Sequence, residues 1–487
     1  MSLTTALNIA QSSLRSLTRQ TSIVSSNVAN AQNPDYTRRS AAIESTNGGV
    51  RFVEVRRHTS DGLFASAMRA LSDGEAQSTL ADRISTLRAD LLGADDSLSL
   101  QSFLSEFQNA LQTFAGAPSN NQFASVVVAR AGDLATRLNE VSGSIQSFRT
   151  DIDAQISDSV DSLNGLLAEF GEVNTDIVNG TRLGRDVSDL LDRRDAMLKE
   201  ISTLVPLQTL GRADNDIVLM TRGGTTLFET MPRTVSFDRT MTFAPGVTGN
   251  PIRIDGVPLS GGIGANTDAS GQLAALVQLR DTVAPTLQAQ ADEFARGLIS
   301  AFAEQDQSGG GLPALAGLFS HAGGPALPPA GTVATGLAGS IVINAAFDPA
   351  QGGDPTLLRD GGANGASYLE NAAASPAFAD RLIQLGQNLL EPLSFDAVTG
   401  IDGNRSVESF GSEMTGWLDG FRSRALQSSE TKAALAARLQ ETLANETGVN
   451  IDEEMSKLLD LEHSYEASAR VISAVDDMLS TLLASVR

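Results

Sequence analysis

The chain of 487 residues contains no cysteine, three lysines and only three histidines. The absence of cysteine excludes disulfides, thiolate metal sites and cysteine nucleophiles. His58, His321 and His463 are far apart and have different neighbours, so their spacing forms no catalytic triad or zinc motif. The acidic loops at 348–360 lack the ligand spacing of an EF-hand, and no Gly-x-x-x-x-Gly-Lys phosphate-binding loop occurs. We therefore predict no enzyme activity, catalytic residue, cofactor site or metal site.

The sequence also lacks a targeting or membrane-spanning pattern. No basic segment followed by an apolar core opens it, and no run of about eighteen apolar residues occurs. Acidic residues outnumber basic ones by 58 to 35, which gives a formal net charge of -23 at pH 7. Such a charge repels nucleic acid and anionic membranes at long range. We expect neither as a partner, and we expect secretion without a cleavable signal peptide, which a chain without cysteine suits.

Aromatic residues are scarce as well. They make up 5% of the chain, with a single tryptophan, whereas 41% of the residues are hydrophobic. This balance favours helices that pack through alanine, leucine and serine over the compact core of a typical enzyme. The chain is too long for one hydrophobic core, so about two to four domains are expected.

What the sequence does contain is an apolar heptad stripe at each end, the pattern of a coiled-coil helix. The N-terminal stripe runs through Leu3, Leu7, Ala10, Leu14, Leu17, Thr21, Val24, Val28 and Ala31. The C-terminal stripe runs through Ile451, Met455, Leu458, Tyr465, Ile472, Val475, Leu479, Leu482 and Val486. Isolated helices of this size are marginal in water, so the stripes must bury their apolar side chains, at about 1.5 to 3 kcal/mol each. They could pair within one domain, or become fully ordered only in an assembly.

Helical periodicity dominates the rest of the chain, and a small β domain interrupts it. Helices are expected at residues 62–92, 97–114, 121–178, 187–204, 270–305, 367–390 and 406–445. The helix of roughly sixty residues at 121–178 implies an elongated rod. β structure is expected as a hairpin at 41–59, as short runs at 206–264 and as one strand at 339–347. The glycine- and proline-rich segment 306–365 is typical of surface loops.

The predicted fold is therefore mainly α with a small inserted β domain. Residues 1–40 and 446–487 form a terminal coiled-coil core domain, and residues 41–205 and 265–445 form an elongated helical domain. Residues 206–264 form the inserted β domain, which is expected to face outward.

Charged residues cluster near the starts of two predicted helices. Asp189 and Arg193, like Asp195 and Lys199, are four residues apart with the acid first, the favourable orientation for ion pairs on a solvated helix face. The adjacent carboxylates at 453–454 are expected as N-terminal helix charges, because acidic groups there interact favourably with the helix dipole. Neither group is predicted to form an active site.

Several motifs resemble a known family. The Ser-x-Asn-Val-Ala-Asn segment at 25–30, followed by Tyr-Thr-Arg at 36–38, is similar to the N-terminal signature of flagellar rod, hook and hook-associated proteins. Asp35 stands where that signature usually has Gly. The segments 190–198 and 448–455 resemble characteristic stretches of the flagellar hook-associated proteins, and the resemblance is spread over most of the chain.

This resemblance implies a structural protein of the bacterial flagellum that is exported by the type III route, acts outside the cell in motility, and self-assembles between hook and filament. The implied partners are further copies in a ring, the hook protein on one side, a second hook-associated protein or the filament on the other, and an export chaperone at the C-terminal helix. The implied assembly interface comprises both stripes together with Asn27, Asn30, Tyr36, Thr37 and Arg38.

Other functions remain open at this point. Another flagellar axial protein, such as a hook, rod or second hook-associated protein, would share the terminal stripes. A secreted cell-wall enzyme with helical arms would require convergent carboxylates in the 206–264 domain. A chaperone-like or adhesin-like binding module would require an exposed apolar groove in the monomer.

Overall fold

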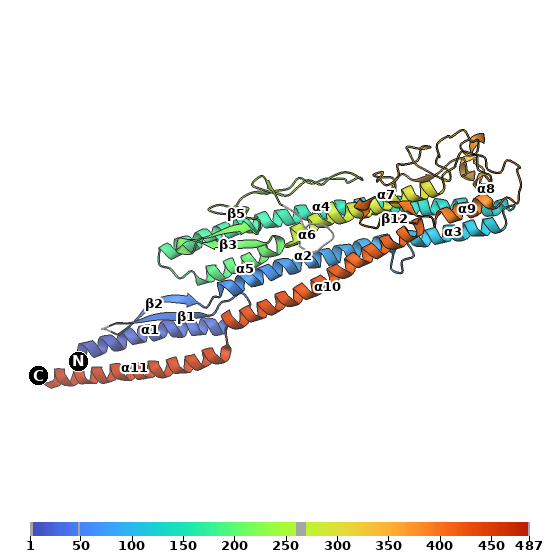
Figure 1. Cartoon of the computed structure of the whole chain (residues 1–487). Coiled ribbons are helices and arrows are strands. Elements are labelled where there is room, and N and C mark those ends of the chain that lie inside the picture. The colour runs from blue at the N-terminus through green and yellow to red at the C-terminus, as the bar shows by residue number, and fades with distance from the viewer. Residues whose placement is uncertain (1–2, 47–48, 260–268, 486–487) are drawn as a thin grey trace.

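The computed structural model of the chain describes residues 3–46, 49–259 and 269–485. The molecule is long and narrow, with the start of the first helix and the end of the last helix at one end and a loop-rich tip at the other (Figure 1). Helices make up most of it, and its β-sheets are small. The prediction of a mainly α fold with long terminal helices is confirmed. Within the described ranges no helix is both long and apolar enough to cross a membrane.

The terminal domain consists of two long helices and a hairpin. α1 (Leu3–Ala29) and α11 (Ile451–Ser485) lie side by side and run in opposite directions (Figure 1). β1 (Arg39–Thr46) and β2 (Gly49–Arg57) form the expected hairpin, which packs against α1. Its turn at 47–48 lies outside the described ranges. α1 is therefore covered by α11 and by the hairpin.

The rod is a bundle of long helices. α2 (Asp61–Leu92) leaves the terminal domain, α10 (Val407–Thr447) returns to it, and the two helices pack along much of their length (Figure 1). α4 (Asn121–Arg182) has 62 residues, which corresponds to roughly 90 Å. The side chain of Asn120 caps α4 by accepting a hydrogen bond from a backbone N–H of its first turn. The long helix expected at 121–178 is confirmed and extends slightly further.

A continuous hydrophobic core runs through the rod because α4 presents apolar side chains at steps of three, four and seven residues. Its fully buried members include Leu134, Leu138, Ile145, Ile152, Ile156, Leu163 and Leu167. α3 (Leu100–Gly116) packs against α4. Its Phe107 belongs to an aromatic cluster with Phe302 and Phe319, whose ring centroids lie 5.1 to 5.7 Å apart. Burial of these side chains, at about 25 cal/mol per Å2, is the main stabilising contribution.

α5 (Ser188–Leu204) packs against α4 and leads into the inserted β segment. Two small antiparallel sheets follow, made of β3 (Leu207–Gly211), β4 (Ile217–Thr221), β5 (Thr226–Phe228), β6 (Val235–Ser236), β7 (Arg253–Ile254) and β8 (Val257–Pro258). The ring of Phe228 meets that of Phe170 in α4 edge to face at 5.0 Å. The β segment therefore shares the core of the rod. The β runs expected at 206–264 are confirmed as far as residue 259, where the described range ends.

The next helical segment, expected at 270–305, consists of α6 (Gln272–Gln278), a π-helical turn (Leu279–Val283) and α7 (Ala284–Ala301). The π turn carries Arg280, which is buried. Arg280 donates to the Asp153 carboxylate at 2.5 Å and to the Asn250 carbonyl at 2.8 Å. These bonds attach the long loop of the β segment to the rod.

The tip of the rod, residues 302–406, consists of loops with short elements. These are β9 (Phe319–Ser320), β10 (Val342–Ile343), α8 (Leu357–Asp360), α9 (Asp380–Asn388), β11 (Leu393–Ser394) and β12 (Asn404–Arg405). The tip also contains single 3-10 turns at Pro349–Gln351, Ala366–Tyr368 and Ala397–Thr399. One further 3-10 turn, Ala213–Asn215, lies between β3 and β4 of the β segment. The strand expected at 339–347 is limited to β10, and the helix expected at 367–390 is limited to α9, so both predictions are wrong in extent. In the latter segment the Asn371 side chain accepts from the Ser375 N–H and donates to Asp360, which stabilises a turn instead.

Candidate assembly surface and the joint of the terminal domain

The C-terminal stripe is only partly buried in the pair that α11 forms with α1. Its buried and half-buried members are Leu458, Ile472, Val475 and Leu479. Its exposed members, with 43 to 52% of their surface accessible, are Ile451, Met455, Tyr465 and Leu482. At the start of α11 the buried position is Glu454 and not Met455, so the predicted stripe is out of phase there by one residue. Val486 lies outside the described residues.

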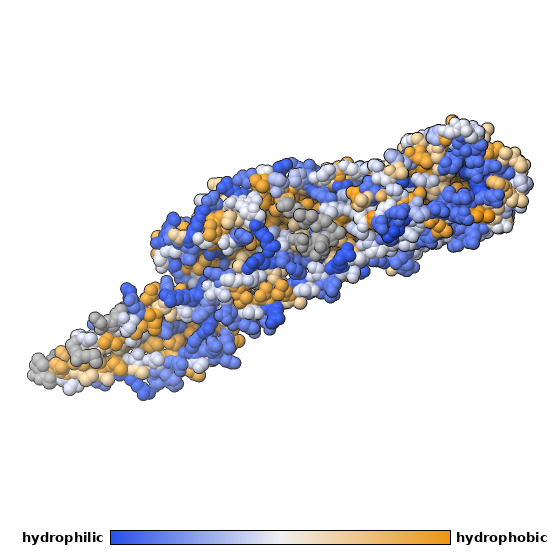
Figure 2. Space-filling view, viewed as in Figure 1, coloured by the Kyte–Doolittle hydropathy of each residue, from blue (hydrophilic) through white to orange (hydrophobic). Residues whose placement is uncertain are grey.

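α1 supplies the other half of the pair and is more evenly covered. The half-buried members of its stripe include Leu3, Leu7, Leu14 and Leu17, and Val24 is buried. α11 also exposes apolar residues beyond the predicted stripe, namely Leu459, Val471, Met478 and Leu483. Figure 2 shows apolar surface distributed along the terminal domain. After α1 and α11 have paired, a substantial apolar surface therefore remains uncovered, which is the property of an interaction site.

Asn27 is buried near the end of α1 and uses all the hydrogen-bonding capacity of its amide. Its oxygen accepts from the Tyr36 hydroxyl at 2.9 Å and from the Arg39 N–H at 3.1 Å. Its nitrogen donates to the Arg39 carbonyl and to Glu454, both at 2.8 Å. This one side chain therefore joins α1, the turn that follows it, and α11.

We call this contact between α1, the turn that follows it and α11 the joint. Glu454 is the carboxylate at its centre, although the sequence indicated only a helix-terminal charge. It is 1% exposed and accepts from Asn27, from Arg38 Nε at 2.9 Å and from Lys457 Nζ at 3.1 Å. Glu453 contacts the same arginine at 3.4 Å from an exposed position. Burial raises the pKa of Glu454, but the bonds from Asn27, Lys457 and Arg38 outweigh it and keep the pKa below its ordinary value.

The other residues of the N-terminal signature shape the turn after α1. The Asn30 amide donates to a carbonyl one helical turn earlier. Thr37 Oγ1 accepts from Arg57 Nη2 at 3.0 Å. The backbone N–H of Arg38 donates to the carbonyl of Thr447, at the end of α10, at 2.8 Å. The turn therefore touches the hairpin and α10 as well as the two terminal helices.

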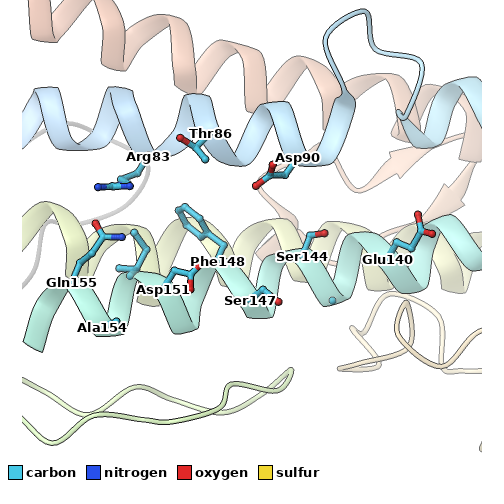
Figure 3. Close-up of a pocket in the computed structure, with 12 residues that line it drawn as sticks. Arg83, Thr86, Asp90, Glu140, Ser144, Ser147, Phe148, Asp151, Ala154 and Gln155 are labelled. Atoms are coloured by element: carbon cyan, nitrogen blue, oxygen red, sulfur yellow. The ribbon is translucent and has the colours of Figure 1, made fainter.

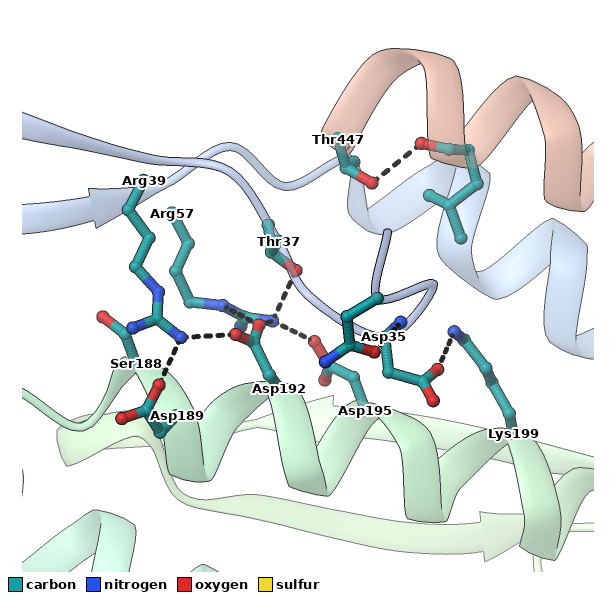
Figure 4. A network of polar contacts seen from close by, with 12 residues as sticks. Asp35, Thr37, Arg39, Arg57, Ser188, Asp189, Asp192, Asp195, Lys199 and Thr447 are labelled. Carbon is teal, nitrogen blue, oxygen red and sulfur yellow. Dashed lines mark hydrogen bonds and ion pairs between the residues drawn. The ribbon is translucent and has the colours of Figure 1, made fainter. Parts of the chain in front are cut away.

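A row of aspartates on α5 holds the base of the hairpin (Figure 4). Arg39 Nη2 lies 2.6 Å from oxygens of both Asp189 and Asp192, and Arg57 Nη2 lies 2.7 Å from Asp192 and 2.6 Å from Asp195. Arg39 and Arg57 stand directly opposite each other on β1 and β2, and opposed like charges destabilise a sheet. Asp192 is buried between them and bonds to both. These two arginines and three aspartates form the hairpin clasp.

The charged residues of α5 therefore bond to other elements, and the prediction of a solvated face with pairs inside the helix is wrong. Among the described contacts, Lys199 bonds to Asp35 at 2.8 Å, and Arg193 bonds to Glu169 of α4. Asp35 is not among the residues with positive φ. Burial raises the pKa of Asp195 above its ordinary value in spite of the neighbouring arginines.

The structure has a groove on the rod and a cleft at the joint. A polar groove of about 700 Å3 lies between α2 and α4 and is lined by residues such as Arg83, Asp90, Glu140 and Asp151 (Figure 3). A cleft of about 1330 Å3 lies at the joint, between the hairpin, α2, α5 and the end of α10. Among the described residues no group of three His, Asp or Glu side chains is arranged to hold a metal ion. The arrangement at the joint is suited to binding two parts of the chain together.

Comparison with known proteins agrees with this organisation. The family model described as the flagellar hook-associated protein FlgK helical domain matches residues 88–318, and the model of the flagellar basal body rod FlgEFG protein C-terminal region matches residues 440–485. Flagellar hook-associated protein 1 of Bacillus subtilis is 23% identical over 98% of this chain and 97% of its own length. Its namesake in Salmonella typhimurium is 24% identical over 42% of this chain and 38% of its own length.

A solved structure has the same fold. The flagellar hook junction protein FlgK from Burkholderia pseudomallei superposes with a TM-score of 0.57 at 12% identity, covering 78% of this chain and 99% of that one. Paired terminal helices on a long helical rod are thus an arrangement that this chain shares with a flagellar hook junction protein. In sequence the chain is similar to flagellar hook-associated protein 1 over nearly its whole length.

Proposed function

We propose that the chain is a structural subunit of the bacterial flagellum that joins hook to filament by polymerising through its terminal helices into a ring. The names of its relatives support the location, since they are hook-associated and hook junction proteins. The observation that carries the mechanism is the apolar surface left on α11 after α1 has packed against it. Residues such as Met455, Leu482 and Leu483 are 43 to 72% exposed, and further copies of the chain would bury them.

Under this proposal the partners are other copies of the chain, the hook protein on one side, and a second hook-associated protein or the filament on the other. The chain acts outside the cell after export without a cleavable signal, and it has no enzyme activity. Before assembly, an export chaperone binds α11 as an amphipathic helix. Calorimetry of a peptide of residues 449–487 with that chaperone should show binding, and the absence of a binding signal would exclude this part of the proposal.

The polymerisation surface can be tested with two matched leucines. Leu482 is 52% exposed on α11, so Leu482→Asp should leave the α1–α11 pair intact and prevent assembly. Leu183→Asp adds the same charge at a leucine that is 66% exposed beside the end of α4, and it should leave assembly unchanged. Leu479→Asp, at a half-buried position of the pair, should abolish assembly while the rod stays folded.

The readout is electron microscopy of hook–filament junctions in cells that carry only the variant, with swimming as a second measurement. Circular dichroism of the purified variants reports whether the helices are retained. If Leu482→Asp forms normal junctions, the exposed face of α11 is not the polymerisation surface. If Leu183→Asp prevents junctions as well, added charge alone explains the defect.

A further inference from the structure

Methionine is the residue of this chain that peroxides attack most readily, because the chain has nine methionines and no cysteine. How fast each thioether reacts depends on its access to solvent. Among the described methionines, Met68 and Met197 are buried, at 4 and 5% exposure. Met455 and Met478 are 43 and 50% exposed. Both of these lie on α11, the helix whose exposed face carries the proposed polymerisation.

Each of these two methionines lies at the centre of an apolar cluster on α11. Residues four or seven apart lie on the same face of a helix. The neighbours of Met455 and Met478 at these spacings are apolar and 47 to 54% exposed. The two clusters are Ile451, Met455 and Leu459 near the start of the helix, and Val471, Met478 and Leu482 near its end. The thioethers therefore occupy the middle of the apolar surface that α1 leaves uncovered.

Oxidation makes these central positions polar. Hydrogen peroxide transfers one oxygen atom to the thioether sulfur, which loses two electrons, and the peroxide leaves as water. The product is a methionine sulfoxide, whose oxygen is a hydrogen-bond acceptor. In the isolated chain water donates to this oxygen, so α11 stays folded. Against the apolar surface of another copy the oxygen has no donor, which weakens association by about tenfold for each methionine.

We propose that Met455 and Met478 are oxidation sites at which a peroxide prevents polymerisation of the chain. The inference rests on the proposed function, since it requires that other copies cover the exposed face of α11. Assembly would bury both sulfur atoms. They are therefore oxidised in the free chain and protected in a finished ring, so that a peroxide stops further assembly and leaves existing junctions intact.

Two other methionines provide an internal control. Met231 and Met241 are 66 and 71% exposed, so they should react at least as fast as the two on α11. Both lie between β5 and β7 of the β segment. Met231 borders a shallow groove whose lining includes Glu172 and Asp176 of α4, so a polar oxygen there remains in polar and solvated surroundings. Oxidation of these two residues should leave polymerisation unchanged.

The experiment uses the purified chain before and after brief treatment with hydrogen peroxide, which catalase then removes. Each sample is added to hooks isolated from cells that lack the chain. Electron microscopy measures hook binding, and mass spectrometry of peptides measures the conversion of each methionine. We expect all four exposed methionines to be converted and hook binding to weaken by about tenfold or more. Methionine sulfoxide reductases A and B should restore binding, with dithiothreitol supplying the two electrons for each sulfoxide.

Leucine variants separate the two pairs of sites. Leucine is apolar and similar to methionine in volume, so the double variant Met455→Leu, Met478→Leu should bind hooks before and after peroxide. Its other exposed methionines are still oxidised. The matched double variant Met231→Leu, Met241→Leu should lose binding after peroxide, as the unsubstituted chain does. Loss of binding in the first variant after peroxide, or resistance of the second, would overturn the inference.

Failure of this inference is distinguishable from failure of the proposed function. If the untreated chain does not bind hooks, the proposed function fails and the inference falls with it. If the untreated chain binds and the oxidised chain binds equally well with Met455 and Met478 converted, only the inference fails. The test of the polymerisation surface with Leu482→Asp is independent of that result.

Discussion

Replacing Glu454 by alanine should weaken the joint that holds the terminal domain together. The carboxylate is 1% exposed, and its loss would leave one amide N–H of Asn27 without an acceptor and Arg38 with only the exposed Glu453, 3.4 Å away. A buried donor without a partner costs about 1 to 3 kcal/mol, and a charge-assisted hydrogen bond contributes about 1.5 to 3 kcal/mol. Because the Arg38 side chain is 20% exposed, water can recover part of its loss. We expect the pairing of α1 with α11 to lose about 3 kcal/mol.

Hydrogen–deuterium exchange of the isolated chain measures this pairing locally, since α1 and α11 can open while the rod stays folded. A loss of about 3 kcal/mol corresponds to roughly 100-fold faster exchange in α1 and α11, with exchange in α4 unchanged. Glu453→Ala is the matched control. It removes the same charge from the next residue, whose side chain is 56% exposed and 3.4 Å from Arg38, and it should cost less than about 0.5 kcal/mol. Equal acceleration by the two substitutions would refute this account of the joint.

Three other perturbations have defined outcomes. The folded-state pKa of Glu454 lies below its ordinary value of 4.5, so its stabilising contribution is present above the unfolded-state pKa and is lost as the pH falls through the folded-state pKa. Exchange in α11, measured relative to Glu454→Gln, should therefore accelerate only below about pH 4.5. Asp192→Asn leaves the two opposed arginines of the hairpin without their shared carboxylate and should destabilise the terminal domain by about 2 kcal/mol. Asp189→Asn, with a side chain that is 89% exposed, should cost less than about 0.5 kcal/mol in the same thermal melts. Gly271 has φ 79°, and an added Cβ would lie 2.6 Å from a backbone carbonyl oxygen. Gly271→Ala should thus destabilise the rod by about 2 kcal/mol or more, and an unchanged calorimetric Tm would contradict this.

The long helices are predictable because their apolar spacing is both regular and sustained. α4 keeps its buried residues at helical spacing over 62 residues, and no strand pattern competes with it. The short elements at the tip are less predictable. There, side-chain bonds such as those of Asn371 decide between helix and turn, and a tendency toward helix in a few residues is easily overridden.

The joint is the least predictable part, because the residues that bond to one another there are distant in sequence. Glu454 bonds to Asn27 and Arg38 across 427 and 416 residues, and nothing in its immediate neighbours indicates burial. One signal does exist. Counting back in steps of three and four from Leu461 through Leu458 leads to Glu454, so a stripe drawn through Leu461 includes the buried carboxylate.

The hairpin clasp was equally difficult to predict from the sequence. In isolation, α5 has the composition of a solvated helix, and its acids and bases are spaced for pairs within the helix. Only the register of the hairpin shows that Arg39 and Arg57 face each other and need a shared anion. The N-terminal signature predicts Asn27, Tyr36 and Arg38 as part of an assembly interface, and in the structure all three form bonds within the chain at the joint.

The insertion of the whole rod between α1 and α11 has a consequence for folding kinetics. In an unfolded chain, bringing these helices together requires closure of a loop of more than 400 residues, and such long-range contacts form late. Once α2 and α10 have packed, α11 is connected to the rod by the short segment 448–450, and α1 is connected to it by residues 30–60, which include the hairpin. The rod then acts as a template that holds both helices at the same end. Folding should therefore proceed from the rod toward the terminal domain, and unfolding should begin in the terminal domain.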